Sequence, residues 1–404
     1  MLRRWAGEFD PQVIIICVMT LVIMLGSGVI APVLPLLAQE FGVSYAGAGG
    51  LVSAFALGRI PFDFIGGTLV DRISPRFVAS GGAALVTLSA LLSTQVESFG
   101  FLLVYRLIGG IGSALFIITA MAFLVRTVAP KRMGQAMGFY QSMLLLGVSF
   151  GPSVGGVAAS FFDSLYAPFW AMTVLSFAVT LMCLRWIGEF PRSSSDAPDA
   201  PTQPVSMYQV LRQLIWDPTF LFACLLTFLT FAVRSGMMMT LVPLFAQETA
   251  QVTETGIGSL QSASSFANLL ILWHAGRLLD HIGRRRVAIP FLCATALSIV
   301  VFPWATTFGL LLLASAAFGL VSGYLGPAPA AIIADIAPKG TAGAVMGLYR
   351  MSGDFGLLLG PIIIGWAAGQ IGVGATFVGI ACFTLLVAVF GFSARETLHE
   401  VQRN

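Results

Sequence analysis

Charged residues are scarce in this chain. They make up 10% of its 404 residues, whereas 57% are hydrophobic, and a soluble domain carries about 25% charged residues. A chain this apolar could not stay soluble at this length, so its solvent has to be a lipid bilayer. The net charge of +3 indicates no surface for nucleic acid.

Residues that build catalytic and metal sites are equally scarce. The chain has no phosphate-binding glycine loop, no soluble catalytic domain and no cluster with metal-ligand spacing. We therefore expect no enzyme, no metal and no cofactor, and an ion gradient, in the first instance of H+, as the energy source. Both asparagines, Asn268 and Asn404, lie outside glycosylation signals, which fits our expectation of a bacterial inner membrane. The cysteines are odd in number and widely spaced in apolar runs, so we interpret them as small hydrophobic residues. They are Cys17, Cys183, Cys224, Cys293 and Cys382.

Twelve apolar runs recur along the chain, each long enough to cross the hydrocarbon core of a bilayer. Only helices satisfy their own backbone groups in lipid over such lengths. The sequence therefore predicts an all-α polytopic membrane protein with twelve transmembrane helices. The predicted spans are 12–36, 46–70, 77–94, 100–125, 134–160, 166–187, 219–246, 256–279, 287–306, 309–336, 342–369 and 372–393.

The basic residues predict the orientation of these spans. Of the 21 Lys and Arg residues, four lie well inside spans, and the others gather in the tails and in the loops after spans 2, 4, 6, 8 and 10. The opposite loops carry acidic residues and no basic ones. By the positive-inside rule, both termini are expected to be cytoplasmic.

The chain consists of two similar halves. Residues 188–218 are polar and rich in proline, which predicts a cytoplasmic linker between a bundle at 1–187 and a bundle at 219–404. At an offset of 208 or 209 residues, Gly147-x-x-x-Gly151-Pro152 recurs as Gly356-x-x-x-Gly360-Pro361. Since six helices is an even number, the repeat is parallel, as in rocker-switch transporters with a site between the halves.

A short charged motif follows the second and the eighth span. A carboxylate such as Asp71 can accept hydrogen bonds from the amides of a helix N-terminus and pair with an arginine, for which Arg126 and Arg132 are candidates. The motif would then be a cytoplasmic gate, the alternative being an ordinary loop carboxylate. Its residues are Gly67, Asp71, Arg72 and Arg76 in the first copy and Gly276, Asp280, Arg284 and Arg285 in the second.

The fifth span carries glycines every four residues, which share one helix face and permit close approach of another helix. The proline in this span removes one internal hydrogen bond and favours a bend. The alternative to a functional motif is tight packing alone. The motif consists of Gly147, Gly151, Pro152, Gly155 and Gly156.

These motifs resemble those of the major facilitator superfamily, over nearly the whole chain. Arg106-x-x-x-Gly110-x-Gly112 is similar to the arginine motif of its proton-coupled members. The motif of the fifth span and Pro32-x-x-Pro35 are typical of its twelve-helix drug:proton antiporters. The resemblance implies two pseudo-symmetric six-helix bundles and alternating access. It also implies a monomer that exports small amphipathic molecules in exchange for protons.

Ionisable residues inside the spans are costly unless they are paired or hydrated. Only two acids lie well inside, Asp63 and Asp354, each four residues after an arginine, Arg59 and Arg350. A proton carrier needs a carboxylate whose pKa its surroundings can move. We therefore take both acids, with Arg106, as candidates for proton coupling. The alternative is that both are permanent structural ion pairs.

Four intramembrane arginines against two acids leave an excess of positive charge. This excess supports an alternative function, a carrier that imports or exchanges organic anions or anionic lipids, unless the arginines bond to backbone carbonyls instead. The resemblance implies that spans 1, 4, 7 and 10 face a central cavity, where methionine and aromatic side chains suit a permissive pocket. Such side chains can equally face lipid or pack, and His274 is expected to be structural. The substrate-cavity candidates are Arg59, Arg234, Arg350, Met24, Phe116, Tyr140, Gln141, Met238, Asn268, Tyr324 and Tyr349.

Overall fold

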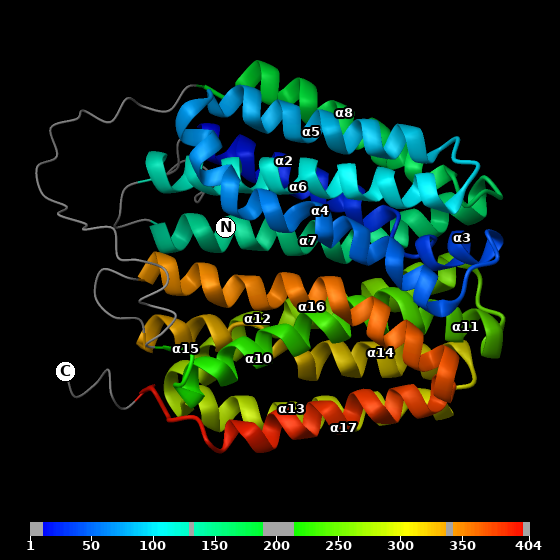
Figure 1. The fold of residues 1–404 in the computed structure, drawn as a ribbon, viewed down its shortest axis with the longest axis vertical. Coiled ribbons are helices and arrows are strands. Elements are labelled where there is room, and N and C mark those ends of the chain that lie inside the picture. The colour runs from blue at the N-terminus through cyan, green and yellow to red at the C-terminus, as the bar shows by residue number, and fades with distance from the viewer. Residues whose placement is uncertain (1–10, 129–132, 189–213, 337–341, 399–404) are drawn as a thin grey trace, which may run out of the picture. The chain divides into compact units, whose positions relative to one another are not determined.

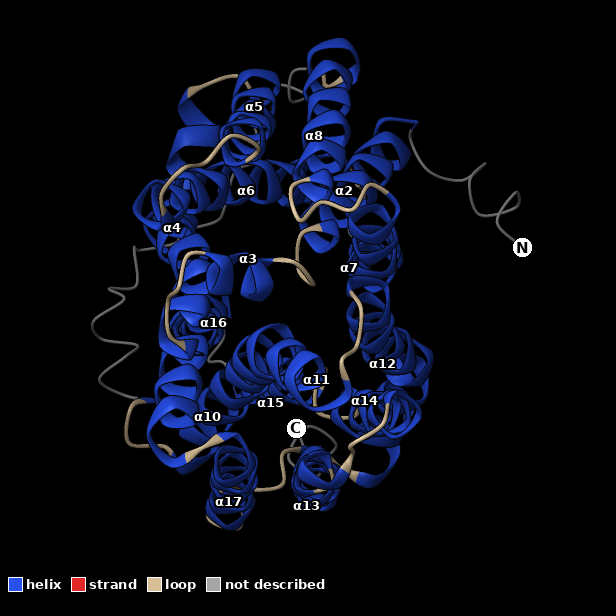
Figure 2. Ribbon diagram, turned by 90° about the vertical axis from the view of Figure 1, so that its right-hand side faces the viewer, coloured by secondary structure: helices blue, strands red, loops and turns tan. Residues whose placement is uncertain are grey.

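In the computed structural model, residues 11–128, 133–188, 214–336 and 342–398 are described. Every regular element among them is a helix (Figure 2). The first six spans are α2 with α3 (Pro11–Val29, Leu34–Glu40), α4 (Tyr45–Arg72), α5 (Pro75–Ser93), α6 (Phe99–Thr127), α7 (Met133–Phe161) and α8 (Ala167–Trp186) (Figure 1). The other six are α10 with η2 and α11 (Pro218–Ala232, Val233–Leu241, Val242–Ala250), α12 (Glu254–Ile282), α13 with η3 (Arg284–Val300, Phe302–Trp304), α14 with α15 (Phe308–Gly323, Ala328–Ile336), α16 (Ala342–Ile371) and α17 (Val373–Gly391).

The prediction of twelve spanning helices is confirmed. Ten of the described spans are long and apolar enough to cross a membrane by composition alone. The other two, α4 and α12, have 28 and 29 residues, long enough to cross a bilayer of about 30 Å at 1.5 Å per residue. Most of the predicted linker lies outside the described residues.

The first, seventh and tenth spans depart from a regular α-helix in a way that the apolar pattern did not predict. The first leaves helical geometry between Val29 and Leu34, close to Pro32 and Pro35, and the tenth between Gly323 and Ala328, at Gly326-Pro327. Proline lacks the amide hydrogen that the helix needs, which explains both breaks. The seventh span continues without a break, but its residues Val233–Leu241 form a π-helix.

The helices group into two compact units. Among the described residues, the first unit takes in 11–42, 54–128, 133–188 and 253–262. The second takes in 43–53, 214–252, 263–336 and 342–398. Each unit therefore includes the first turns of one helix, α12 or α4, whose remainder belongs to the other unit.

The two units repeat the same packing. In the first, α2 packs on α7 and α8, and α5 packs on α6 and α8. In the second, α10 and η2 pack on α16, and α13 packs on α14 and on α17, which lies beside it in both views (Figures 1 and 2). Large apolar side chains such as Phe116, Phe169, Phe222 and Phe377 are almost fully buried within these units. The pseudo-symmetry expected from the sequence repeat is therefore present in the fold.

Candidate functional site

The glycines of the fifth span lie directly against the backbone of the first span. A Cβ atom on Gly151 would lie 2.6 Å from the Cα of Gly28, and one on Gly147 would lie 2.6 Å from the carbonyl oxygen of Leu21. A Cβ on Gly155 would collide with the carbonyl of Val29. Only glycine permits this approach, so α2 and α7 touch backbone to backbone.

A second face of α7 meets the first turns of α12 within the same unit. A Cβ on Gly156 would collide with the Glu254 carbonyl, and one on Gly258 with the Pro152 carbonyl. The backbone amide of Ser153, which follows the proline, donates to the hydroxyl of Ser262 at 3.0 Å. The motif therefore fixes α7 to two helices at once, because its glycines lie on two faces.

The second unit contains the counterpart of both contacts. A Cβ on Gly360 of α16 would lie 2.5 Å from the Cα of Ala232, and one on Gly49 of α4 would collide with the Pro361 carbonyl. Close by, the Tyr45 hydroxyl donates to Glu248 at 2.5 Å, and the Ser53 hydroxyl donates to the Leu358 carbonyl at 2.5 Å.

Arg106 lies where α4 and α6 cross in the first unit. Its side chain is buried at 7% exposure, and its guanidinium lies 4.6 Å from the centre of the Phe55 ring. Glycines on both helices, Gly58 and Gly110, allow the close crossing because a Cβ on either would collide with the opposite backbone. Arg59 follows Gly58 and is half-buried. The crossing therefore brings two of the predicted arginines to one region of the first unit.

Arg234 lies in the π-helical part of the seventh span. Its Nη2 donates to the hydroxyl of Ser265 on α12 at 3.2 Å. Met237 and Met238 in the same segment are buried. π-helical segments are rare and occur frequently at functional sites, so this geometry adds a reason to single out Arg234 that the sequence alone did not offer.

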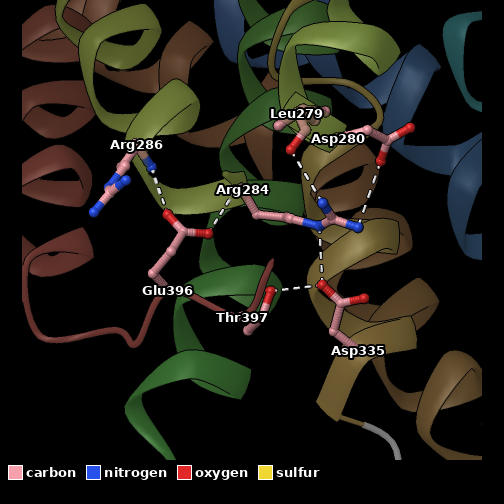
Figure 3. Close-up of polar contacts among 7 residues, drawn as sticks. All are labelled: Leu279, Asp280, Arg284, Arg286, Asp335, Glu396 and Thr397. Atoms are coloured by element: carbon pink, nitrogen blue, oxygen red, sulfur yellow. Dashed lines mark hydrogen bonds and ion pairs between the residues drawn. The ribbon is translucent and has the colours of Figure 1, made fainter. Parts of the chain in front are cut away.

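The second copy of the charged motif forms a network at the start of α13 (Figure 3). The guanidinium of Arg284 lies 2.9 Å from Asp335 at the end of α15 and 3.5 Å from Asp280. Asp335 also accepts a hydrogen bond from Thr397 at 2.6 Å. Asp280 was predicted as part of the motif, whereas Asp335 was not among the predicted residues.

The segment after α17 completes the network. The carboxylate of Glu396 accepts the backbone amides of Arg284 at 2.7 Å and of Arg286 at 3.0 Å (Figure 3), and Arg285 donates to the Ala394 carbonyl at 2.7 Å. A carboxylate at a helix N-terminus satisfies free amides and the helix dipole. Glu396 was not among the predicted residues, and since the same tails and loops carry other acids such as Asp71 and Asp280, the sequence offered no signal that would single it out.

The first copy of the motif is only partly described. The side chains of Asp71 and of the proton-coupling candidate Asp63 and the burial of Gly67 are not described, and Arg132 lies outside the described residues, whereas Arg72 and Arg76 are exposed. The other proton-coupling candidate, Asp354, is half-buried on α16, and Arg350 one turn before it is exposed.

The remaining cavity candidates divide by burial. Met24, Phe116, Tyr140 and Met238 are buried, Gln141 is exposed, and Asn268, Tyr324 and Tyr349 are half-buried. Tyr324 contacts His274 and Phe291. The structure thus joins Tyr324 to a histidine that the sequence analysis had taken as structural.

Comparison with known proteins decides the family. The model of the Major Facilitator Superfamily matches residues 16–253 and 223–404, which is nearly the whole chain. The chain belongs to this superfamily. This membership, together with the apolar helices, makes it an integral membrane transporter that acts on small molecules and not an enzyme.

The individual relatives of this chain are distant in sequence. An uncharacterized MFS-type transporter of Methanocaldococcus jannaschii, MJ1560, is 24% identical over 391 residues, 96% of this chain and 98% of that protein. The quinolone resistance protein NorA of Staphylococcus aureus is 22% identical over 360 residues, 88% of this chain and 89% of NorA. Among solved structures, a D-xylose-proton symporter matches with a TM-score of 0.77 at 16% identity, over 95% of this chain and 98% of that one.

Proposed function

We propose that this transporter is a proton-coupled exporter of small amphipathic molecules. The observation that carries the proposal is the motif of the fifth span, whose glycines hold α7 against α2 and against the first turns of α12. The resemblance of this motif to drug:proton antiporters and the similarity of the chain to the quinolone resistance protein NorA support the same class of substrate. The proposal includes a monomer in a bacterial inner membrane with both termini in the cytoplasm.

In this proposal the intramembrane acids carry the proton. An ionised Asp354 can pair with Arg350 one turn earlier on α16, and Asp63 can pair in the same way with Arg59 on α4. Protonation removes the negative charge and releases the arginine, so each acid can exist in two states that differ in their contacts. Arg106, buried beside Phe55, supplies a fixed positive charge in the first unit.

The network around Arg284 is the proposed gate at the basic end of the helices. Its ion pair with Asp335 joins α13 to α15, and both side chains are only 11% exposed. An ion pair that is shielded from water is held by charge-assisted hydrogen bonds and is costly to break. We therefore expect two distinct states of the transporter, one with this ion pair formed and one with it broken.

The test uses the two acids. In inverted membrane vesicles, an imposed pH gradient is expected to drive accumulation of tetraphenylphosphonium by the wild type and by the control Glu97→Gln, since Glu97 is an exposed loop acid. Asp354→Asn or Asp63→Asn is expected to abolish this accumulation because a neutral amide cannot carry the proton. Retained gradient-driven accumulation in both variants would refute the assignment of the proton carriers.

A second candidate function is carriage of organic anions or anionic lipids. It is favoured by Arg106 and Arg234, which lie deep in α6 and in the π-helical segment. A ligand that binds the folded state alone raises the melting temperature. Stabilisation of the purified protein by carboxylates or lysolipids, and not by lipophilic cations or neutral amphiphiles, would favour this carrier over the exporter.

A further inference from the structure

His274 and Tyr324 form a hydrogen-bonded pair in the second unit. The Nδ1 of His274 on α12 lies 2.9 Å from the hydroxyl oxygen of Tyr324 at the end of α14. The two rings meet edge to face, with centroids 5.7 Å apart. The pair thus joins two helices through one titratable ring.

The tyrosine is held in place from the other side. Its ring stacks on Phe291 of α13, with centroids 3.7 Å apart and an angle of 16° between the planes. Tyr324 is also the residue at which α14 ends and the tenth span breaks. Stacking fixes the ring, so the hydroxyl group is the part of Tyr324 that can respond to a change on His274.

His274 lies well inside the eighth span and yet has an exposed side chain. It lies eight residues before the end of α12 at Ile282, about 12 Å along the helix at 1.5 Å per residue, yet its side chain is exposed. Ionisable side chains inside spans almost always face other protein groups or a water-filled path, because facing hydrocarbon is costly. Histidine is also the side chain that ordinarily changes charge near neutral pH.

Two ionisable groups among the described residues can be placed near the ring: Tyr324 at the end of α14, which contacts it, and Arg277, three residues further along α12. Arg277 is engaged with Trp273, its guanidinium 3.4 Å from the centre of that ring. From α13, the group that closes the stack is the neutral Phe291.

We propose that His274 carries a coupled proton in the transport cycle and that Tyr324 is its positioning residue. This inference rests on the proposed proton coupling and adds a second type of carrier to the two aspartates. In the neutral ring with its hydrogen on Nε2, Nδ1 accepts the hydrogen of the Tyr324 hydroxyl. When a hydronium ion transfers its proton to Nδ1 and leaves as water, the imidazolium donates to the tyrosine oxygen and the hydroxyl hydrogen rotates away from the ring. Loss of that proton reverses both changes, so the charge of His274 is transmitted to the break in the tenth span.

The first measurement needs no substrate. The chain has three histidines, so nitrogen NMR of the full-length protein labelled at histidine, in nanodiscs, gives few signals, and His274→Gln identifies the one in question. We expect the nitrogen shifts of this signal to report the hydrogen bond at Nδ1. Tyr324→Phe keeps the stacking ring and removes the hydroxyl, and is expected to change the Nδ1 shift. A His274 signal that is the same in the wild type and in Tyr324→Phe would overturn the inference while leaving the proposed function intact.

The second measurement separates coupling from folding. In proteoliposomes, His274→Gln is expected to lose pH-driven accumulation of tetraphenylphosphonium but to retain its exchange at equal pH on both sides. The matched control is His281→Gln, an exposed histidine in the last turn of the same helix, which should behave as wild type. Wild-type accumulation that persists in His274→Gln overturns the inference alone, and so does loss of exchange, because that indicates a structural role. Absence of pH-driven accumulation in the wild type refutes the exporter together with this inference.

Discussion

Replacing Gly151 by alanine tests whether the contact between α2 and α7 requires glycine. The added Cβ would lie 2.6 Å from the Cα of Gly28 and 2.8 Å from the carbonyl oxygen of Leu25. Because carbon atoms in contact are normally about 3.5–4.0 Å apart, the two helices would have to separate by about 1 Å. The obstructing atoms belong to the backbone, so no side chain can rotate to make room.

The matched control is Gly138→Ala on the same helix, because Gly138 has no atom within 4 Å of an added Cβ. Alanine is favoured over glycine inside a helix by about 0.5–1 kcal/mol, and both variants share this gain. The difference between them should therefore equal the cost of overpacking, about 1–3 kcal/mol. We expect Gly151→Ala to be the less stable variant and Gly138→Ala to be at least as stable as the wild type.

The assay is thermal unfolding of the purified protein in detergent, followed by tryptophan fluorescence. An independent repetition is available in α16, where Gly360 meets the backbone of Ala232 and Gly369 has no atom within 4 Å of an added Cβ. If Gly151→Ala melts at the temperature of Gly138→Ala, and Gly360→Ala at that of Gly369→Ala, the close packing derived for both helix pairs is wrong.

The charged network gives two further predictions. Arg284→Gln leaves Asp335, 11% exposed, without its cation and is expected to cost about 3–5 kcal/mol as a broken buried pair. Asp280→Asn removes a partner that is 71% exposed and should cost at most about 1 kcal/mol, so equal melting temperatures for these two variants would contradict the ranking. Glu396→Gln weakens two charge-assisted bonds to the amides of Arg284 and Arg286. It should destabilise the protein by about 1–3 kcal/mol, measured as a lower melting temperature, and wild-type stability would refute a capping role for Glu396.

The spanning helices were predictable because the property that defines them belongs to one continuous stretch of sequence. A helix that crosses a bilayer needs a minimum apolar length, and that length can be read directly from the chain. The glycine face of α7 was predictable for a similar reason, since a spacing of four residues determines a shared helix face. The helix that this face meets, α2, followed only from the structure.

The main ion-pair partner of Arg284 could not be predicted from the sequence. Along one helix, residues four apart are neighbours, so the pattern directly offers Asp280, which lies at 3.5 Å and is largely exposed. The closer and better shielded partner, Asp335, is 51 residues away on another helix. Spacing cannot reveal a pair of this kind, and the same holds for His274 and Tyr324, which are 50 residues apart.

Comparison of the two copies of the sequence repeat distinguishes glycines at helix contacts from polar residues with a proposed role in transport. Several glycines at which an added Cβ would crowd backbone atoms occur in pairs, one in each copy, at an offset of 208 or 209, because both units share these helix contacts, whereas Gly58 and Gly155 have no glycine counterpart. These pairs are Gly28 with Gly236, Gly49 with Gly258, Gly151 with Gly360 and Gly156 with Gly365.

The polar groups do not follow this rule. At an offset of 208, the residue equivalent to Arg106 is Ala314, the one equivalent to Arg234 is Gly26, and the one equivalent to Tyr324 is Phe116. At an offset of 209, the residue equivalent to His274 is Ile65. A residue that maintains a helix contact common to both units is expected in both copies of the repeat. A residue that binds the substrate or carries a proton is needed in one copy alone. Among these polar departures, Arg234 lies in a π-helix and His274 bonds to Tyr324 at the break in the tenth span. A change at either position should therefore alter transport with little effect on stability.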